Sequence, residues 1–137
     1  MLILHTKGGR PRNFFRCFVP LLPQFNSNSL LVPAPSHLHR RHAWQWAWVL
    51  GERTALPISD VLRVRSKPLS LRRLSREQRM QSLSFCIEPP GFGPNRGQPI
   101  VFVDDVLTTG ATASAAWRAL GEPENFSVFC FAERIQL

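Results

Sequence analysis

The residues best suited to chemistry form one short stretch late in the chain, Val101 to Thr112. Two adjacent acids, Asp104 and Asp105, are followed by a turn made of Thr108, Thr109, Gly110, Ala111 and Thr112. A helix that begins in such a turn presents unpaired backbone N–H groups and partial positive charge, which suit a phosphate. Ionised carboxylates only accept hydrogen bonds, so the two acids suit the adjacent hydroxyls of a sugar. The stretch is predicted to bind a phosphorylated ribose.

A purely structural role is the alternative, in which the two acids end a strand and a threonine caps a helix. The order of strand, turn and helix favours the ligand site instead. The chain has no Gly-Lys-Ser/Thr phosphate loop and no G-x-G-x-x-G fingerprint, so P-loop kinase and dinucleotide-dependent dehydrogenase chemistry are excluded.

Strands and helices alternate around this stretch. Apolar runs predict strands at residues 30–32, 61–64, 83–87, 100–103 and 127–132. Helical spacing predicts a helix over about 42–55. A second helix is predicted with Ala113, Ala116, Trp117 and Leu120 on one face, and Gly121 supplies its stop. A short helix over 75–83 follows from Ser75 and Gln78, which fit a capping box. This alternation predicts an α/β fold with a mostly parallel sheet of about five strands, flanked by helices, and ligands at the carboxyl ends of the strands.

The length of 137 residues predicts a single domain, 1–137, and the 44% hydrophobic content is that of a globular protein. No apolar run reaches the length of a membrane span, because even 14–22 contains Arg16 and Pro20. We expect a cytoplasmic protein without a membrane contact. Its 3 cysteines, Cys17, Cys86 and Cys130, have no metal-ligand spacing and are expected to be buried reduced thiols.

The net charge of +8 favours phosphate-bearing partners. Basic residues concentrate in one segment, which contains Arg63, Arg65, Lys67, Arg72, Arg73, Arg76 and Arg79. A phosphate-binding loop and a solvated basic surface are both open interpretations of it. His37, His39 and His42 lack a completing ligand and are read as surface residues. Trp44, Trp46 and Trp48 could stack on bases, but packing in a core or a homodimer contact is favoured.

The stretch from Val101 to Thr112 resembles the motif that binds 5-phosphoribosyl-1-pyrophosphate (PRPP) in type I phosphoribosyltransferases: an apolar strand, two acids and a T-T-G-x-T turn. Leu31-Val32-Pro33-Ala34-Pro35 is similar to the V-P-x-P loop of the ComF family, the competence-associated members of that superfamily. Leu74-Ser75-Arg76, with Arg79 and Phe85, resembles the basic middle segment of that family, and 132–134 its C-terminal end.

The resemblance implies a phosphoribosyltransferase-like domain that binds PRPP or ribose 5-phosphate together with substrate-bound Mg²⁺. The reaction implied is transfer of the 5-phosphoribosyl group to a nitrogen acceptor with release of pyrophosphate, with a link to competence and DNA uptake. Asp104 and Asp105 would hold the ribose, and the turn 108–112 the 5-phosphate. Pyrophosphate would meet the residues Ala34, Pro35, Ser36, Arg65, Lys67, Arg72, Arg73, Arg76 and Arg79.

Three departures from the family pattern bear on function. The cysteine-rich zinc-binding segment of the family is not expected here, so no zinc and no metal held by protein ligands alone is expected. The family has R-G-F-N-Q where this chain has Arg41-His42-Ala43-Trp44-Gln45, and Ser82 stands where asparagine is usual. Two alternatives therefore stay open: a PRPP or nucleotide sensor without transfer activity, and an accessory protein that binds single-stranded DNA.

Overall fold

The computed structural model describes residues 23–35, 42–65, 75, 84–88, 93–107 and 109–133. In chain order its elements are β1 (Leu30–Pro33), α2 (His42–Thr54), β2 (Leu62–Val64), β3 (Phe85–Ile87), β4 (Ile100–Leu107), α4 (Ala111–Ala119) and β5 (Phe126–Glu133). Every predicted strand and the two longer predicted helices are confirmed. The short helix predicted over 75–83 lies outside the described residues, apart from Ser75.

The central sheet is parallel and has the strand order β1-β4-β5. Leu30 of β1 pairs with Ile100 of β4, which pairs in turn with Phe126 of β5. A single parallel bridge between Leu31 and Ile58 adds a short neighbour on the other side of β1. The α/β class with a mostly parallel sheet is thus confirmed.

The five described strands do not all lie in that sheet, which corrects the expectation of one central sheet. β2 and β3 form a separate antiparallel pair, with Leu62 opposite Ile87 and Val64 opposite Phe85. Both strands are short, and their backbone pairing continues at both ends: the Arg65 N–H donates to Ser84 O at 3.0 Å and the Glu88 N–H to Val61 O at 2.8 Å. Periodicity identifies a strand but not its partner, so this division was not visible in the sequence.

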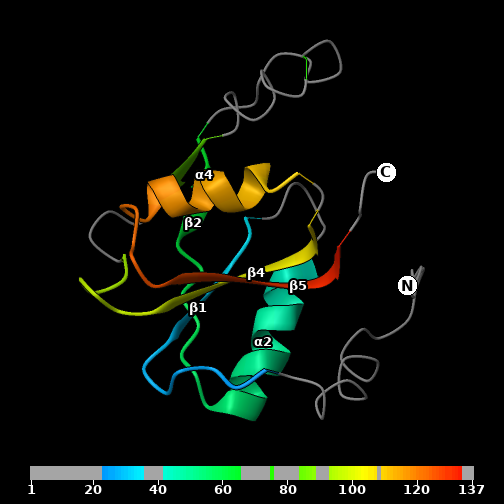
Figure 1. Ribbon diagram of the computed structural model, residues 1–137, viewed down its shortest axis with the longest axis vertical. Coiled ribbons are helices and arrows are strands. Elements are labelled where there is room, and N and C mark those ends of the chain that lie inside the picture. The colour runs from blue at the N-terminus through cyan, green and yellow to red at the C-terminus, as the bar shows by residue number, and fades with distance from the viewer. Residues whose placement is uncertain are drawn as a thin grey trace.

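Two apolar cores cover the two faces of β4. Ile100 and Phe102 pack with Ala113 and Ala116 of α4, whereas Val101 and Val103 pack in the other core, which contains residues of α2. This follows from the two-residue period of a strand, which sends alternate side chains to opposite faces. Figure 1 shows the consequence: α4 and α2 lie on opposite sides of the sheet.

The buried face of α2 centres on Trp46, which is 4% exposed, together with Ala43, Ala47, Val49 and Leu50. Trp44 and Trp48 are half-buried and pack on each other, with ring centroids 5.4 Å apart. The preference for packing over base stacking is consistent with this arrangement. None of the described helices is long and apolar enough to span a bilayer.

α4 differs from its predicted pattern at one position. Ala113, Ala116 and Leu120 are buried as expected, but Ala115 is the fourth buried residue, and Trp117 is 36% exposed. The Trp117 indole N–H donates to Pro123 O at 3.2 Å, so the ring turns towards the chain that leaves the helix. An indole needs a partner for its N–H, and the backbone beyond the helix supplies one.

Candidate functional site

β4 extends four residues further than its apolar pattern predicts, to Leu107. Asp104 and Val106 pair with Cys130 and Ala132 of β5, so the acids belong to the strand rather than to a loop after it. On the other side, β1 ends at Pro33, opposite Val103. From Asp104 onward β4 therefore has a described neighbour on one side only. The predicted strand end at Val103 is corrected, because hydrophobicity reports burial and not backbone pairing.

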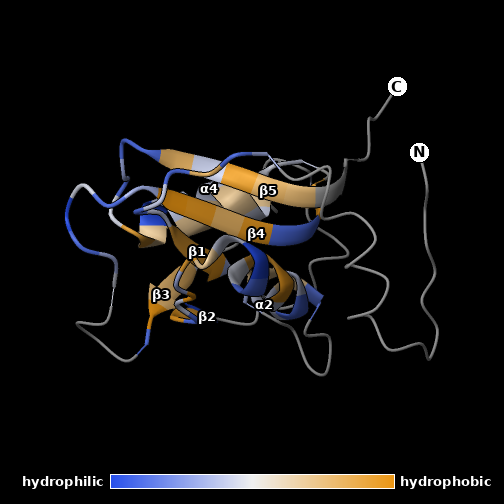
Figure 2. Cartoon of the chain, turned by 90° about the horizontal axis from the view of Figure 1, so that it is seen from below, coloured by the Kyte–Doolittle hydropathy of each residue, from blue (hydrophilic) through white to orange (hydrophobic). Residues whose placement is uncertain are grey.

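Both acids accept hydrogen bonds from the backbone immediately after them. The Asp105 N–H donates to Asp104 Oδ1 and the Val106 N–H donates to Asp105 Oδ1, each at 2.8 Å. The side chains are half-buried, and Figure 2 shows β4 changing from hydrophobic to hydrophilic towards its carboxyl end.

Burial raises the pKa of Asp104 from 3.8 to about 7. The hydrogen bond from the Asp105 backbone opposes this rise, and the neighbouring Asp105 carboxylate adds to it. Near neutral pH, the protonated and ionised forms of Asp104 are therefore both populated. Ligand groups that donate hydrogen bonds favour its ionised form, so their binding would release a proton at this carboxyl group.

The turn after β4 leads directly into α4. Gly110 caps the helix in the left-handed conformation, with φ of 74°, and makes no side-chain capping bond. The Thr109 hydroxyl accepts the Ala111 N–H at a long 3.4 Å, and Thr112 is half-buried in the first turn. Thr108 lies outside the described residues. The first N–H groups of a helix have no partner within it, so this helix start can receive an anion.

The loop after β1 is brought to the same edge of the sheet. The Ala34 N–H donates to Val103 O at 2.8 Å, next to the point where the acids begin. Ala34 is partly buried against the core that contains α4, and Pro35 follows it. Of the residues predicted to meet pyrophosphate, these two therefore lie beside β4.

The remaining predicted pyrophosphate residues do not gather at this edge in the described part of the chain. Ser36, Lys67, Arg72, Arg73, Arg76 and Arg79 fall outside the described residues. Arg65 is exposed directly after β2, and no polar contact joins it to either acid among the described residues. Its assignment remains a prediction.

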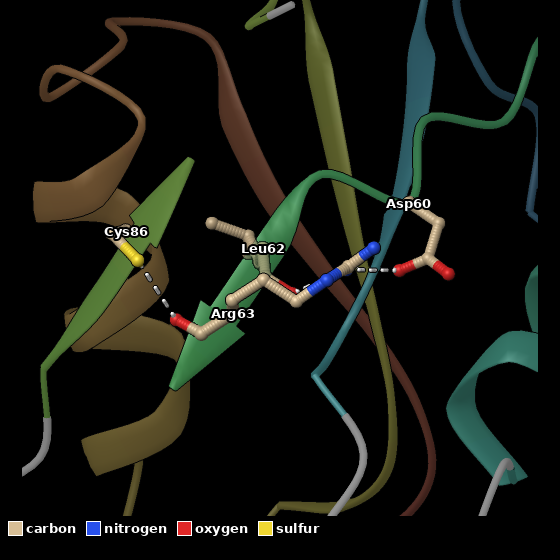
Figure 3. A network of polar contacts seen from close by, with 4 residues as sticks. All are labelled: Asp60, Leu62, Arg63 and Cys86. Atoms are coloured by element: carbon tan, nitrogen blue, oxygen red, sulfur yellow. Dashed lines mark hydrogen bonds and ion pairs between the residues drawn. The ribbon is translucent and has the colours of Figure 1, made fainter. Parts of the chain in front are cut away.

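Arg63, at the start of the basic segment, has a local partner. Its guanidinium lies 3.0 Å from Asp60 Oδ1 and also donates to Leu62 O at 2.8 Å, as Figure 3 shows. Cys86 packs across the strand pair, with Sγ 3.8 Å from Arg63 O. Cys86 and Cys130 are half-buried, which corrects the expectation of buried thiols; Cys17 lies outside the described residues.

The arrangement brings together three chemical functions at the carboxyl edge of a parallel sheet. Asp104 and Asp105 offer acceptors for hydroxyls, the start of α4 offers N–H donors for a phosphate, and the end of β1 approaches the same strand. Carboxylate oxygens also suit Mg²⁺, although no group of three or more His, Cys, Asp or Glu residues forms a metal cluster among the described residues. Among these features of the site, the raised pKa of Asp104 could not be predicted from the sequence, because it depends on burial in the folded chain.

Comparison with known proteins gives structural matches alone. No protein-family model matches the chain, and no curated protein matches it. A solved structure described as the allosteric regulatory enzyme of purine biosynthesis is 17% identical, with a TM-score of 0.53 over 87% of this chain and 25% of that one. This likeness shows a shared α/β fold. The chain spans a quarter of that enzyme.

A second solved structure is the purine phosphoribosyltransferase from Pyrococcus horikoshii Ot3. It is 12% identical to this chain, with a TM-score of 0.48 over 90% of this chain and 70% of that one. The fold assignment does not depend on this more distant match.

Proposed function

We propose that the chain is a phosphoribosyltransferase-type protein of the ComF kind that binds PRPP with Mg²⁺ and transfers its 5-phosphoribosyl group to a nitrogen acceptor. The observation that carries this proposal is the β4–α4 junction. Two half-buried carboxylates lie near the carboxyl end of a parallel strand, and a left-handed glycine, which makes no side-chain capping bond, then opens a helix. The T-T-G-x-T resemblance and the shared α/β fold support the same assignment.

Each part of the junction has a distinct task in this proposal. Asp104 and Asp105 accept hydrogen bonds from the two ribose hydroxyls and fix the orientation of the ring. The backbone N–H groups from Gly110 to Thr112 bind the 5-phosphate, and the absence of a Cβ at Gly110 leaves room for close approach. Ala34 and Pro35 approach the pyrophosphate from the end of β1. Thr108 and the basic residues of 65–79 belong to the same proposal.

The protein's contribution to the reaction is then positioning and charge stabilisation. The bond between C1 of the ribose and the pyrophosphate oxygen breaks, a bond between C1 and the acceptor nitrogen forms, and that nitrogen loses a proton. When bound with PRPP, Mg²⁺ would supply positive charge to the pyrophosphate. Ionised Asp104 and Asp105 hold the ring while these bonds change. Because ionised Asp104 is the stronger acceptor for the hydrogen bonds of the ribose hydroxyls, PRPP binding should strengthen as the pH rises through about 7.

A binding protein without transfer activity is the second candidate, and α2 favours it. Where the family has R-G-F-N-Q, Ala43 is buried in this fold and the Trp44 ring packs on Trp48. Side chains committed to packing are not free to select an acceptor. A DNA-uptake accessory that binds single strands through the basic segment is the third candidate.

Titration calorimetry with PRPP and Mg²⁺ tests the site. We expect about one equivalent to bind, and the double change Asp104→Asn with Asp105→Asn to weaken binding at least about 100-fold, since hydrogen bonds to charged groups contribute about 1.5–3 kcal/mol each. Glu52→Gln with Glu124→Gln removes the same charge at exposed positions and should leave binding unchanged. Equal losses in both double variants would contradict the site.

Pyrophosphate release in the presence of purine bases, pyrimidine bases or ammonia separates the first two candidates. Release that depends on one acceptor supports transfer, whereas tight PRPP binding without release supports the sensor. The DNA candidate predicts an affinity for single strands that falls steeply with salt and is unaffected by the two Asp changes. That pattern without PRPP binding would overturn the proposal.

A further inference from the structure

A surface cavity of about 530 Å³, broadly open to solvent, lies at the opposite, amino edge of the sheet. Its lining comes from three places: the turn before β1, the turn before β4, and Pro57. Ile100, where β4 begins, precedes Asp104 by four residues, or roughly 13 Å at about 3.3 Å per residue. The cavity is therefore separate from the carboxyl-edge site, and its volume falls within the range of small-molecule sites.

Backbone and side-chain hydrogen bonds hold the walls of this cavity in place. The Ser29 N–H donates to Asn26 O at 2.9 Å, and the Gln98 N–H donates to Asn95 O at 3.0 Å. Gln98 also uses both ends of its amide: Oε1 accepts the Asn95 N–H at 3.2 Å, and Nε2 donates to Asn28 O at 3.4 Å. The two turns are thus tied to each other as well as closed individually.

Three polar side chains in the lining take no part in the hydrogen bonds that hold the walls. The side chains of Asn28 and Asn95 line the cavity and make no hydrogen bond within the described part of the chain. Arg96 also lines the cavity. Among the described residues the ion pair is formed by Arg63 and Asp60, so Arg96 has no acidic partner there. Within the described residues, the cavity thus offers one cation without an ion-pair partner and two carboxamides, which can both donate and accept hydrogen bonds.

The turn before β4 leaves open space beside Gly97, the residue that follows Arg96. Gly97 has a φ of 78°, and a Cβ placed there would meet nothing within 4 Å. In Figure 2 the turn between the grey trace after β3 and the start of β4 is drawn hydrophilic. Its polar side chains therefore border open space rather than the core.

We propose that this amino-edge cavity binds a small molecule that carries a single oxyanion group, which pairs with Arg96, and a polar body that hydrogen-bonds to Asn28 and Asn95. The anionic group is a phosphate or a carboxylate, since both accept the planar guanidinium fork. The site is independent of the proposed PRPP site and stands whether or not transfer activity is found.

Titration of the ¹⁵N-labelled protein with inorganic phosphate, and separately with malonate, tests this site by amide shifts. We expect saturable shifts at Arg96, Gly97 and the side-chain amides of Asn28 and Asn95, with the stronger probe naming the anion. Sodium chloride at matched ionic strength should not reproduce them. Shifts at Gly110 and Ala111 report the carboxyl-edge site in the same spectra, so failure of one site is distinguishable from failure of the other.

Arg96→Ala should weaken the amino-edge response about tenfold, because a hydrogen-bonded charge pair is lost. Arg118→Ala removes the same charge from an exposed position on α4 and should leave the shifts unchanged. Asn95→Ala should weaken the response, whereas its control Asn125→Ala should not. Arg96→Gln removes the charge at the same exposed position but keeps part of the aliphatic side chain. It should weaken the amino-edge response as Arg96→Ala does. Shifts that rise without saturation, or that fall equally in the Arg96 and Arg118 variants, would overturn the proposal.

Discussion

The two halves of β4 have the same backbone conformation but opposite environments. Ile100 to Val103 are 0–2% exposed and lie between two cores, with strand neighbours on both sides. Asp104 to Leu107 continue the strand with a described neighbour on one side only, and Val106 is 43% exposed. The difference shows how one strand supplies both stability and a site: the buried half fixes the position at which the polar half emerges.

Truncation in the buried half should have the largest effect. Phe102 is fully buried and packs against Phe126, with ring centroids 6.0 Å apart. Phe102→Ala should lower the free energy of unfolding by about 3–5 kcal/mol, through lost apolar burial and a remaining cavity. Val106→Ala, in the polar half, should cost less than about 1 kcal/mol. Equilibrium unfolding in urea measures both, and similar losses would show that the two halves do not differ.

The pH dependence of stability should distinguish the polar half. The folded-state pKa of Asp104, about 7, lies above its ordinary value of 3.8, so the folded state holds a proton that the unfolded state has released between these values. Stability from this group is fully present below pH 3.8 and is lost as the pH rises towards 7.

Asp104→Asn removes this loss and should raise the free energy of unfolding at pH 8 by on the order of 2 kcal/mol. At pH 3.5 the variant and the parent should unfold at nearly the same urea concentration. Urea unfolding of Glu124→Gln, a change at an exposed carboxylate, over the same range provides the control. Parallel stability curves for Asp104→Asn and the parent would show that burial does not hold a proton on Asp104.

The smallest effect is expected at the turn that joins the polar half to α4. Gly110→Ala should cost about 1 kcal/mol, since a Cβ is strained at φ of 74° even though no atom lies within 4 Å of it. Gly110→Asn should recover part of this loss, because asparagine tolerates the left-handed region. Thermal unfolding compares the three proteins; an unchanged midpoint in the alanine variant would mean that the turn relaxes.

The strands, the two longer helices and the residue types of the proposed site could all be predicted from the amino-acid sequence. The apolar run before Asp104 predicted the strand, and the spacing of Ala113, Ala116 and Leu120 predicted the helix that follows, because local periodicity depends on neighbours in the chain. The acids, Gly110 and the loop at Ala34 were identified from residue types alone. Their common location at one edge followed from the parallel topology that the alternation of strands and helices predicted.

Other features depend on contacts between residues that are distant in the chain, and these could not be predicted. Pairing with β5 carries β4 through both acids to Leu107, and burial there raises the pKa of Asp104. The separation of β2 and β3 from the main sheet, and the cavity beside Arg96, likewise arise from contacts between distant segments. A strand's residues specify its conformation, but its neighbours specify how far it extends, which groups lose water and where a concave surface forms.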